Sequence, residues 1–244
     1  MLKAMFATWP GRANAMTSEY TLKARIFPTI LAVLPTILLS NAVFDCQVKD
    51  WLNASDYSAL FGKGAVDLAV VYLLAQVNRL IGAEIFQRLV SSDETNFPTT
   101  RMMLPGNQYL SDSFRSAIAA KIKKTLGLEL PVVVAPYDDR AARRLIVDAV
   151  RHMREKTRGH QLLLQHNIEY GFARNLIGAC PLALLAACTN IYLYQYGLLP
   201  AWGYKASIFY ASASMLLMLL SPWILERYGV RYARILFQAY LDSK

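Results

Sequence analysis

Six arginines share one face of a predicted helix in the middle of this 244-residue chain. The segment from Asp138 to Arg158 has helical periodicity, and at about 100° per residue these arginines fall within an arc of about 100°. They are Arg140, Arg143, Arg144, Arg151, Arg154 and Arg158. The other side of the predicted helix is apolar. Because a guanidinium group binds phosphate oxygens in pairs and stacks on nucleobases, this face predicts a nucleotide or oligonucleotide site.

An alternative interpretation of the arginine-rich face is equally simple. It is a solvated surface enriched by the lysine and arginine bias of membrane proteins, or a surface that lies on anionic lipid. Only Asp139, Asp148 and Glu155 are close enough in sequence to neutralise it. The sequence leaves both interpretations open.

A second basic cluster consists of Lys121, Lys123 and Lys124. It falls at the end of a predicted helix from Ser111 to Leu126, with Ser111 or Asp112 as N-cap and Gly127 as the stop. Lysines at a helix C-terminus also favour the helix dipole, so a ligand is only one explanation for them. If both basic clusters line one groove, the ligand is an extended polyanion.

The elements that must position these clusters include long apolar segments. The chain is 55% hydrophobic and 18% charged, whereas soluble domains carry about 25% charged residues. Residues 26–44, 176–204 and 206–225 are free of charge and long enough to cross a bilayer. The first of these runs contains Pro28 and Pro35, which a bilayer tolerates when neighbouring helices satisfy the freed carbonyl groups.

A further, weaker span is predicted over residues 64–86, the second in chain order, which contain Asp67, Arg79 and Glu84. The distribution of positive charge supports this span. The segment from Arg88 to Arg174 holds fourteen lysines and arginines, whereas the two proposed outside loops carry only Lys49, Lys63 and Lys205. This is the positive-inside pattern, and it places both termini and the central segment in the cytoplasm.

Polar residues within the predicted spans are candidates for a pore lining. Asp67 and Asn78 are three helical turns apart on one face of the second span. Ser207, Ser214 and Ser221 repeat every seven residues in the last span. Two alternatives remain: Asp67 and Arg79 lie at the two membrane interfaces, and the serines serve close helix packing. Either use of the serines favours oligomers, since four helices enclose little room for ions.

We therefore predict a mainly α fold, with four transmembrane helices and a small helical cytoplasmic domain inserted between the second and third. The predicted segments are an N-terminal arm (1–25), helices 1 and 2 (26–86), the cytoplasmic domain (87–170), helices 3 and 4 (171–226) and a cytoplasmic tail (227–244). The expected location is the bacterial inner membrane. The sequence has no recognisable enzyme motif, and the spacing of His152, His160 and His166 is not that of a metal site. We expect no catalytic residue, metal or cofactor.

Two short stretches resemble a known family. Asn167-Ile-Glu-Tyr-Gly-Phe-Ala-Arg-Asn-Leu-Ile-Gly178 and Tyr20-Thr-Leu-Lys-Ala-Arg-Ile-Phe-Pro-Thr29 are similar to the membrane effectors of the Hailong anti-phage defence system. The resemblance covers the segments that lead into the third and first spans and the overall layout. It implies a nucleotidyltransferase encoded nearby, whose single-stranded DNA oligomer holds a membrane channel closed. Loss of the oligomer would open the channel.

The resulting hypothesis is an oligomeric ligand-gated ion channel, for example a tetramer, that acts as an effector of anti-phage defence. A cytoplasmic (deoxy)oligonucleotide would control it through the arginine-rich helix, which we expect to continue into the third span. Opening would depolarise the membrane and cause abortive infection. The alternative hypothesis is a non-conducting membrane anchor or scaffold whose basic helix binds an acidic partner or anionic lipid.

Overall fold

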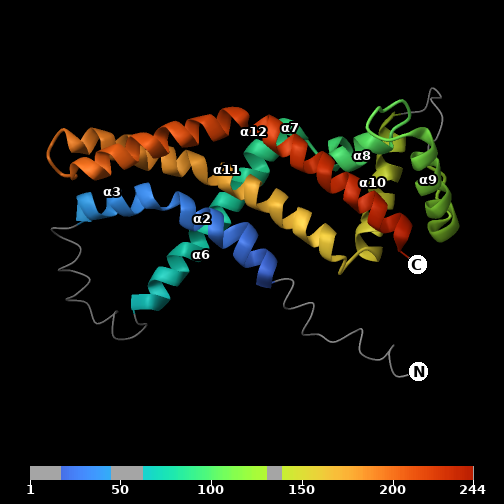
Figure 1. Ribbon diagram of the computed structural model, residues 1–244, viewed down its shortest axis with the longest axis horizontal. Coiled ribbons are helices and arrows are strands. Elements are labelled where there is room, and N and C mark those ends of the chain that lie inside the picture. Colours follow the sequence, from blue (N-terminus) through green and yellow to red (C-terminus); the bar gives the residue numbers. More distant parts are fainter. Residues whose placement is uncertain (1–17, 45–62, 131–138, 244) are drawn as a thin grey trace, which may run out of the picture. The chain divides into compact units, whose positions relative to one another are not determined.

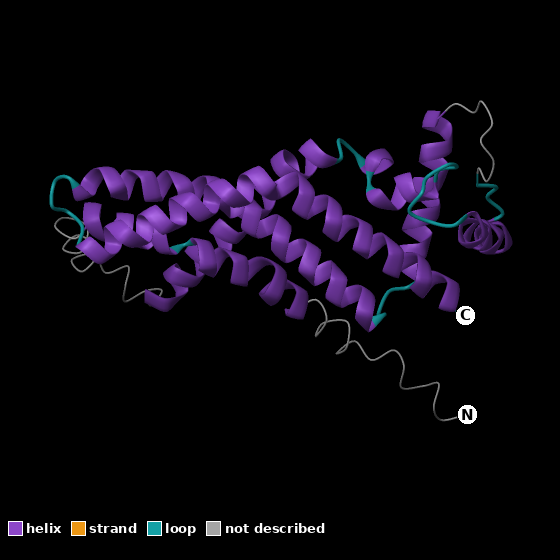
Figure 2. Ribbon diagram, turned by 45° about the horizontal axis from the view of Figure 1, so that its top comes forward, coloured by secondary structure: helices purple, strands orange, loops and turns teal. Residues whose placement is uncertain are grey.

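The computed structural model describes residues 18–44, 63–130 and 139–243, and no strand occurs among them (Figures 1 and 2). The predicted mainly α fold is confirmed. The elements follow one another as η1 (Leu22–Ile26), α2 (Phe27–Ala32), α3 (Leu34–Phe44), α6 (Lys63–Ile81), η2 (Gly82–Gln87), α7 (Arg88–Val90), η3 (Glu94–Asn96), α8 (Pro98–Met103), α9 (Asp112–Leu126), α10 (Asp139–Lys156), α11 (Gln161–Tyr194) and α12 (Ala201–Asp242).

These elements form two compact units. The polar unit contains α7 to α10, α11 as far as Tyr170 and α12 from Trp223 onward. The apolar unit contains η1 to η2, the rest of α11 and the first part of α12. α11 and α12 are each one unbroken helix that contributes residues to both units.

Three helical stretches among the described residues are long and apolar enough to cross a membrane: Ala69–Val90, Gln161–Tyr194 and Ala201–Asp242. They indicate that the protein inserts into a membrane. The first predicted span instead forms two helical parts, Ser18–Ala32 and Leu34–Ser40, which meet at 45°. The number of candidate spans is therefore three, or four if this bent pair is one span.

The first span bends between Ala32 and Leu34, just before Pro35, and contains a second proline at Pro28. Pro28 and Pro35 lack the N–H that a helix interior requires, and each leaves the carbonyl four residues earlier without its helical partner. A neighbouring helix supplies the missing donor at Pro35, because the hydroxyl of Tyr210 donates to the carbonyl of Leu31 at 3.0 Å. The expectation that other helices compensate for these prolines is confirmed at this carbonyl.

Glycines bring α6 and α11 into backbone contact within the apolar unit. A Cβ built on Gly82 would lie 2.5 Å from the carbonyl oxygen of Arg174. A Cβ built on Gly178 would lie 2.6 Å from the main-chain nitrogen of Gly82. Neither position has room for a side chain, so small residues fix where the two helices cross.

The core of the polar unit lies between α8, α9, α10 and α12. Its fully buried side chains come from all four helices and include Met102, Ile118, Ile122, Ile146, Met153, Leu236 and Phe237. The C-terminal part of α12 supplies the last two, together with Tyr240. The predicted tail over residues 227–244 is therefore not a separate segment as far as it is described. Its helix runs to Asp242, because its apolar residues recur at helical spacing and are buried in this core.

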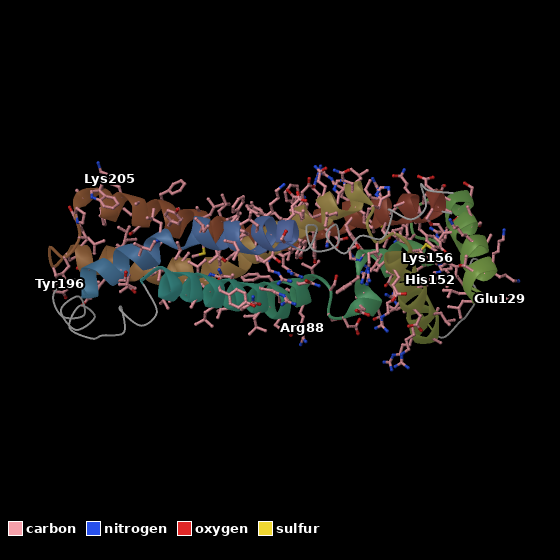
Figure 3. All side chains as sticks on the ribbon, turned by 90° about the horizontal axis from the view of Figure 1, so that it is seen from below. Arg88, Glu129, His152, Lys156, Tyr196 and Lys205 are labelled. Carbon is pink, nitrogen blue, oxygen red and sulfur yellow. The ribbon has the colours of Figure 1, made fainter. Side chains whose placement is uncertain are left out.

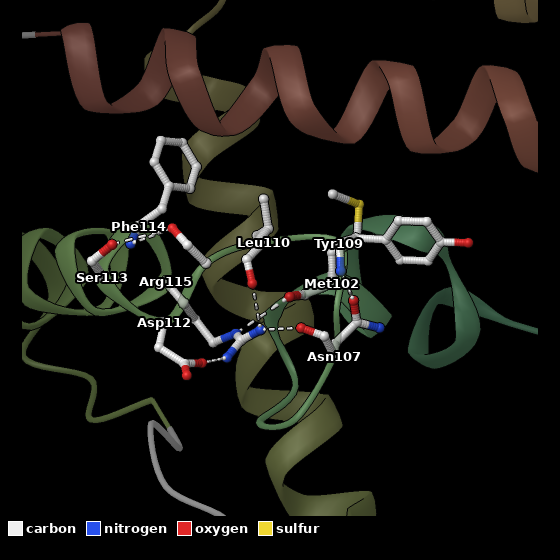
Figure 4. Close-up of polar contacts among 9 residues, drawn as sticks. Met102, Asn107, Tyr109, Leu110, Asp112, Ser113, Phe114 and Arg115 are labelled. Carbon is white, nitrogen blue, oxygen red and sulfur yellow. Dashed lines mark hydrogen bonds and ion pairs between the residues drawn. The ribbon is translucent and has the colours of Figure 1, made fainter.

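A buried arginine holds the loop that precedes α9 (Figure 4). The guanidinium of Arg115 donates to the carbonyls of Asn107 at 2.7 Å and Leu110 at 3.2 Å, and it pairs with Asp112 at 2.5 Å. A buried charge needs such partners. α9 itself begins at the predicted cap, since Ser111 Oγ accepts a hydrogen bond from the N–H of Phe114 at 3.3 Å. It ends at Gly127, whose φ of 68° favours glycine.

Candidate anion-binding site

α10 carries the arginines of the predicted site and is held by its apolar side. Ile146, Ala149 and Met153 are fully buried in the core of the polar unit. The helix ends at Lys156, and the hydroxyl of Thr157 donates to the carbonyl of Met153 at 2.7 Å. Gly159 follows with a φ of 93°, and α11 begins at Gln161. The expected continuity with the third span is therefore wrong, because a left-handed glycine separates the two helices.

The structure divides the six predicted arginines into two groups. Four are exposed: Arg140, Arg144, Arg151 and Arg158. Arg140, Arg144 and Arg151 lie within about 40° of one another on α10 at about 100° per residue, and Arg158 lies in the turn that follows the helix. We call these four residues the exposed arginine face. Arg143 and Arg154 are half-buried, because they lie on the side of α10 that meets η3 and α8. Figure 3 shows the side chains of α10, with His152 and Lys156 labelled.

Arg143 holds a neighbouring segment within the polar unit. Its Nη1 donates to the carbonyl of Thr95 at 3.0 Å and to the side chain of Asn96 at 3.1 Å. η3 presents these acceptors because Asp93 caps it, accepting a hydrogen bond from the N–H of Thr95 at 2.9 Å. The Thr95 hydroxyl donates to the same carboxylate and lowers the pKa of Asp93. Arg143 therefore has a structural role that its sequence position did not reveal.

Arg151 already has a carboxylate partner on the exposed arginine face. Its Nη2 lies 2.8 Å from Glu94, and its Nη1 lies 3.7 Å from Asp148. The hydrogen bond that Arg151 donates to Glu94 raises the pKa of Arg151 above its usual value. Both side chains of this pair remain largely exposed, so a ligand phosphate can compete with Glu94 for the guanidinium.

No ion pair joins Arg144 or Arg158 to a carboxylate among the residues that the structure describes. Arg144 on α10 and Arg158 in the turn after it are both exposed to an incoming anion. Next to Arg151 and Arg154 is a cavity of about 10 Å³, lined also by Glu94 and Thr99. The Nε of Arg154 is buried without an acceptor. Such a cavity is too small for a phosphate group, so a ligand must bind on the surface of α10.

The three predicted lysines have three different environments. The Nζ of Lys121 donates to the carbonyls of Tyr240 at 2.7 Å and Leu241 at 3.1 Å, and also contacts Ser243. Lys121 thus caps the C-terminus of α12 and is not available to a ligand. Lys123 pairs with Glu129 at 2.6 Å, which raises the pKa of Lys123 and lowers that of Glu129. Lys124 is exposed. The lysines therefore do not form one basic cluster.

The predicted pore-lining residues whose side chains the structure describes, Asn78, Ser207, Ser214 and Ser221, are buried within the protomer. Asn78 is 4% exposed and donates to the hydroxyl of Thr29 at 3.2 Å. Ser207 and Ser221 donate to carbonyls of their own helix, those of Gly203 at 2.8 Å and Met218 at 2.7 Å. Ser214 is also buried. The side chain of Asp67 lies outside the described residues. The described geometry favours packing over an open path at these positions.

Ser221 also compensates for a proline. Pro222 lacks the N–H that would bond to the carbonyl of Met218, and the hydroxyl of Ser221 takes its place. The sequence pattern of one serine every seven residues did not distinguish this role from a pore lining. The Ser-Pro pair was the signal that could have done so.

The histidines have partners of their own. The ring of His160 caps α11, since its Nδ1 accepts a hydrogen bond from the N–H of Leu163 at 3.3 Å. His152 lies edge-on to Tyr240, with 6.3 Å between ring centres. Among the described residues, no group of three His, Cys, Asp or Glu side chains is arranged to hold a metal ion.

Comparison of the chain with protein-family models, curated proteins and solved structures finds no match. The candidate site is therefore argued from the arrangement of its own residues. It consists of Arg140, Arg144 and Arg151 on α10 and Arg158 in the turn that follows, all exposed, and Arg151 is paired with Glu94.

Proposed function

We propose that this protein is an oligomeric ion channel of the bacterial inner membrane, an effector of anti-phage defence with both termini in the cytoplasm. A (deoxy)oligonucleotide that binds to the exposed arginine face would control it. Its opening would depolarise the membrane and end the infection by killing the cell. A neighbouring nucleotidyltransferase would supply the ligand.

The observation that carries this proposal is the continuity of α11 and α12. Each runs without a break from residues of the polar unit into residues of the apolar unit. α12 packs on α10, because Tyr240 lies edge-on to His152 and both helices contribute side chains to the same buried core. A ligand that prefers one arrangement of α10 can therefore bias the helices that cross the membrane. Only a difference in affinity between open and closed states produces such gating.

The burial of polar groups supports an assembly of several chains. In one protomer Asn78, Asn175 and Asn190 are all buried, and their amides donate within the apolar unit. An ion path through these helices alone would have to break these bonds. A path between protomers would leave them intact, and the exposed apolar side chains of α12 provide surface for contacts with lipid or other copies.

Ligand binding is tested with two triple variants of equal charge. The first replaces Arg140, Arg144 and Arg158 by Gln. The second replaces the exposed arginines of α12 in the same unit, Arg227, Arg231 and Arg234, by Gln. Binding of a fluorescent single-stranded DNA oligomer is measured by anisotropy over a range of salt concentrations. The α10 variant should bind at least about tenfold more weakly and with a smaller salt slope, because fewer phosphates are neutralised.

The α12 variant is the matched control and should keep most of the affinity. Equal loss in both variants would exclude a localised site on α10. Channel function is tested separately, by recording current from the purified protein in planar bilayers with and without the oligomer. The proposal predicts a current that the oligomer switches. No current in either condition would contradict it.

One observation favours a second function. Arg151 already binds the carboxylate of Glu94, so the same face has the chemistry to bind an acidic protein segment. In that case the protein is a non-conducting membrane anchor. It would then bind acidic peptides through α10, conduct no current and bind single-stranded DNA no better than the α10 variant does.

A further inference from the structure

The helix α6 has chemically different sides within the apolar unit. One side faces neighbouring helices, where Asn78 bonds to Thr29, and η2 continues this contact through Gly82. A second, exposed side carries Tyr72, Gln76 and Arg79, which fall within an arc of about 60° at helical spacing, and the exposed Leu73 and Leu80 lie outside this arc. Tyr72 is 59% exposed, Arg79 is exposed and Gln76 is half-buried. We call these three residues the outer face of α6.

Arg79 lies near the middle of a candidate membrane span. The span runs from Ala69 to Val90, so Arg79 is ten residues from one end and eleven from the other. At 1.5 Å per residue this is about 15 Å from each end. No carboxylate pairs with Arg79 among the described residues. A charged side chain at this depth is costly in hydrocarbon, and such residues face a bundle interior or water.

The exposed surface of α12 in the same unit provides the contrast. Its most exposed side chains are apolar: Phe209, Leu216 and Leu219 are 68%, 57% and 71% exposed. They suit contact with lipid tails. The outer face of α6 is also on the surface of the apolar unit, but it consists of a phenol, an amide and a guanidinium group. The two exposed surfaces therefore call for different surroundings, apolar for α12 and aqueous for the outer face of α6.

We propose that the outer face of α6 lines a water-filled path formed by several copies of this chain, and that Arg79 makes this path selective for small inorganic anions such as chloride. The inference rests on the proposed channel function and names its substrate class. Each copy contributes one Arg79, so an assembly presents a ring of positive charge. Rings of arginine or lysine attract anions and repel cations in a low-dielectric pore.

Selectivity is tested by the reversal potential of the current in planar bilayers across a tenfold gradient of potassium chloride. The wild-type reversal potential should be shifted from zero toward the equilibrium potential of chloride. Arg79→Gln should bring the reversal potential close to zero, and Arg79→Glu should shift it toward the equilibrium potential of potassium. Leu80→Gln is the matched control, because Leu80 is the next residue and is 61% exposed. That variant should keep the wild-type selectivity.

Water access is tested independently of current, in a variant whose three cysteines, Cys46, Cys180 and Cys188, are replaced by serine. Single cysteines are then placed at Gln76 and Arg79, with controls at Leu73 and Leu80, and exposed to a charged thiol reagent that does not cross membranes. Cysteines at Gln76 and Arg79 should react at least about tenfold faster. This measurement also covers the case in which a charge-changing variant fails to fold.

The outcomes separate the two proposals. A wild-type current that is cation-selective, or a selectivity that Arg79→Glu leaves unchanged, overturns this inference while the channel function stands. Equal labelling of the outer face and of the leucine controls also overturns it. The absence of any current contradicts the proposed function. Fast labelling at Gln76 and Arg79 in that case would still support the aqueous face.

Discussion

The amide of Asn175 donates a hydrogen bond of 2.6 Å to the main-chain carbonyl of Ala24. This carbonyl is the one that Pro28 deprives of its helical partner, because proline has no N–H. Asn175 comes from α11 and is 1% exposed, so the bond is fully buried. An asparagine 151 positions away in sequence thus completes the helix that the proline interrupts. In a membrane such compensation decides whether a proline is tolerated.

Asn175→Ala should therefore destabilise the protein by about 1–3 kcal/mol, the cost of a buried acceptor without a partner. The loss should be smaller when Pro28 is also replaced by alanine, because the new N–H can bond to Ala24. Both free energies of unfolding are measurable in mixed micelles by titration with a denaturing detergent. Additive effects of the two substitutions would show that Asn175 does not act through this carbonyl.

The crossing of α6 and α11 should be intolerant of a single methyl group. Gly178→Ala would place a Cβ 2.6 Å from the main-chain nitrogen of Gly82, and only a shift of the helices can relieve this contact. We expect a loss of about 1–3 kcal/mol, as for other overpacked sites. Gly203→Ala is the control, since its Cβ meets the end of the Leu199 side chain at 3.2 Å. Thermal unfolding in detergent should separate the two variants, and equal melting temperatures would contradict the close crossing.

The C-terminus of α12 should depend on one lysine. Lys121→Met removes the donor to the carbonyls of Tyr240 and Leu241. We expect the free energy of unfolding to fall by about 1.5–3 kcal/mol, because the lost hydrogen bonds come from a charged donor. Lys124→Met changes the same charge on the same helix at an exposed position and should have little effect. Hydrogen exchange of the last turn of α12 gives the direct measurement. Similar protection in the two variants would argue against the cap.

Helical periodicity and end signals predicted much of the fold. The limits of α9 follow from Ser111 and Gly127, and the apolar side of α10 from the spacing of Ile146, Ala149 and Met153. The bend before Pro35 was harder to predict, because the freed carbonyl is satisfied by Tyr210, which is remote in sequence. The role of residues 227–242 was missed because their arginines suggested a tail, while their buried side is visible only once α9 and α10 are in place.

The site was predictable in composition but less so in detail. The arc of arginines on α10 follows from spacing alone. The separation of Arg143 from Arg144 does not, because it depends on Thr95 and Asn96, which lie in a short segment without strong periodicity. Lys121 had the same difficulty, since the carbonyls that it caps are more than one hundred residues away.

The cap of η3 should be sensitive to acid. The hydroxyl of Thr95 lowers the pKa of Asp93, with smaller contributions from the backbone N–H groups of Thr95 and Asn96 and from the charge of Arg143. A carboxyl group whose pKa is lower in the folded state stabilises that state above the pKa of the unfolded chain. The contribution is lost as pH falls through the folded value, which here lies below the usual 3.8.

Thr95→Val removes the largest cause of this shift, so the pKa of Asp93 should rise toward 3.8. The titration of the carboxyl carbon can be followed by NMR with labelled aspartate. Ser92→Ala is the control, since its hydroxyl accepts a hydrogen bond from Asn96 and does not contact Asp93. A pKa that is the same in the Thr95 variant and the wild type would contradict the cap.

Because Arg143 binds the segment that Asp93 orders, the two residues should also be coupled: Arg143→Gln should raise the pKa of Asp93, by less than Thr95→Val does.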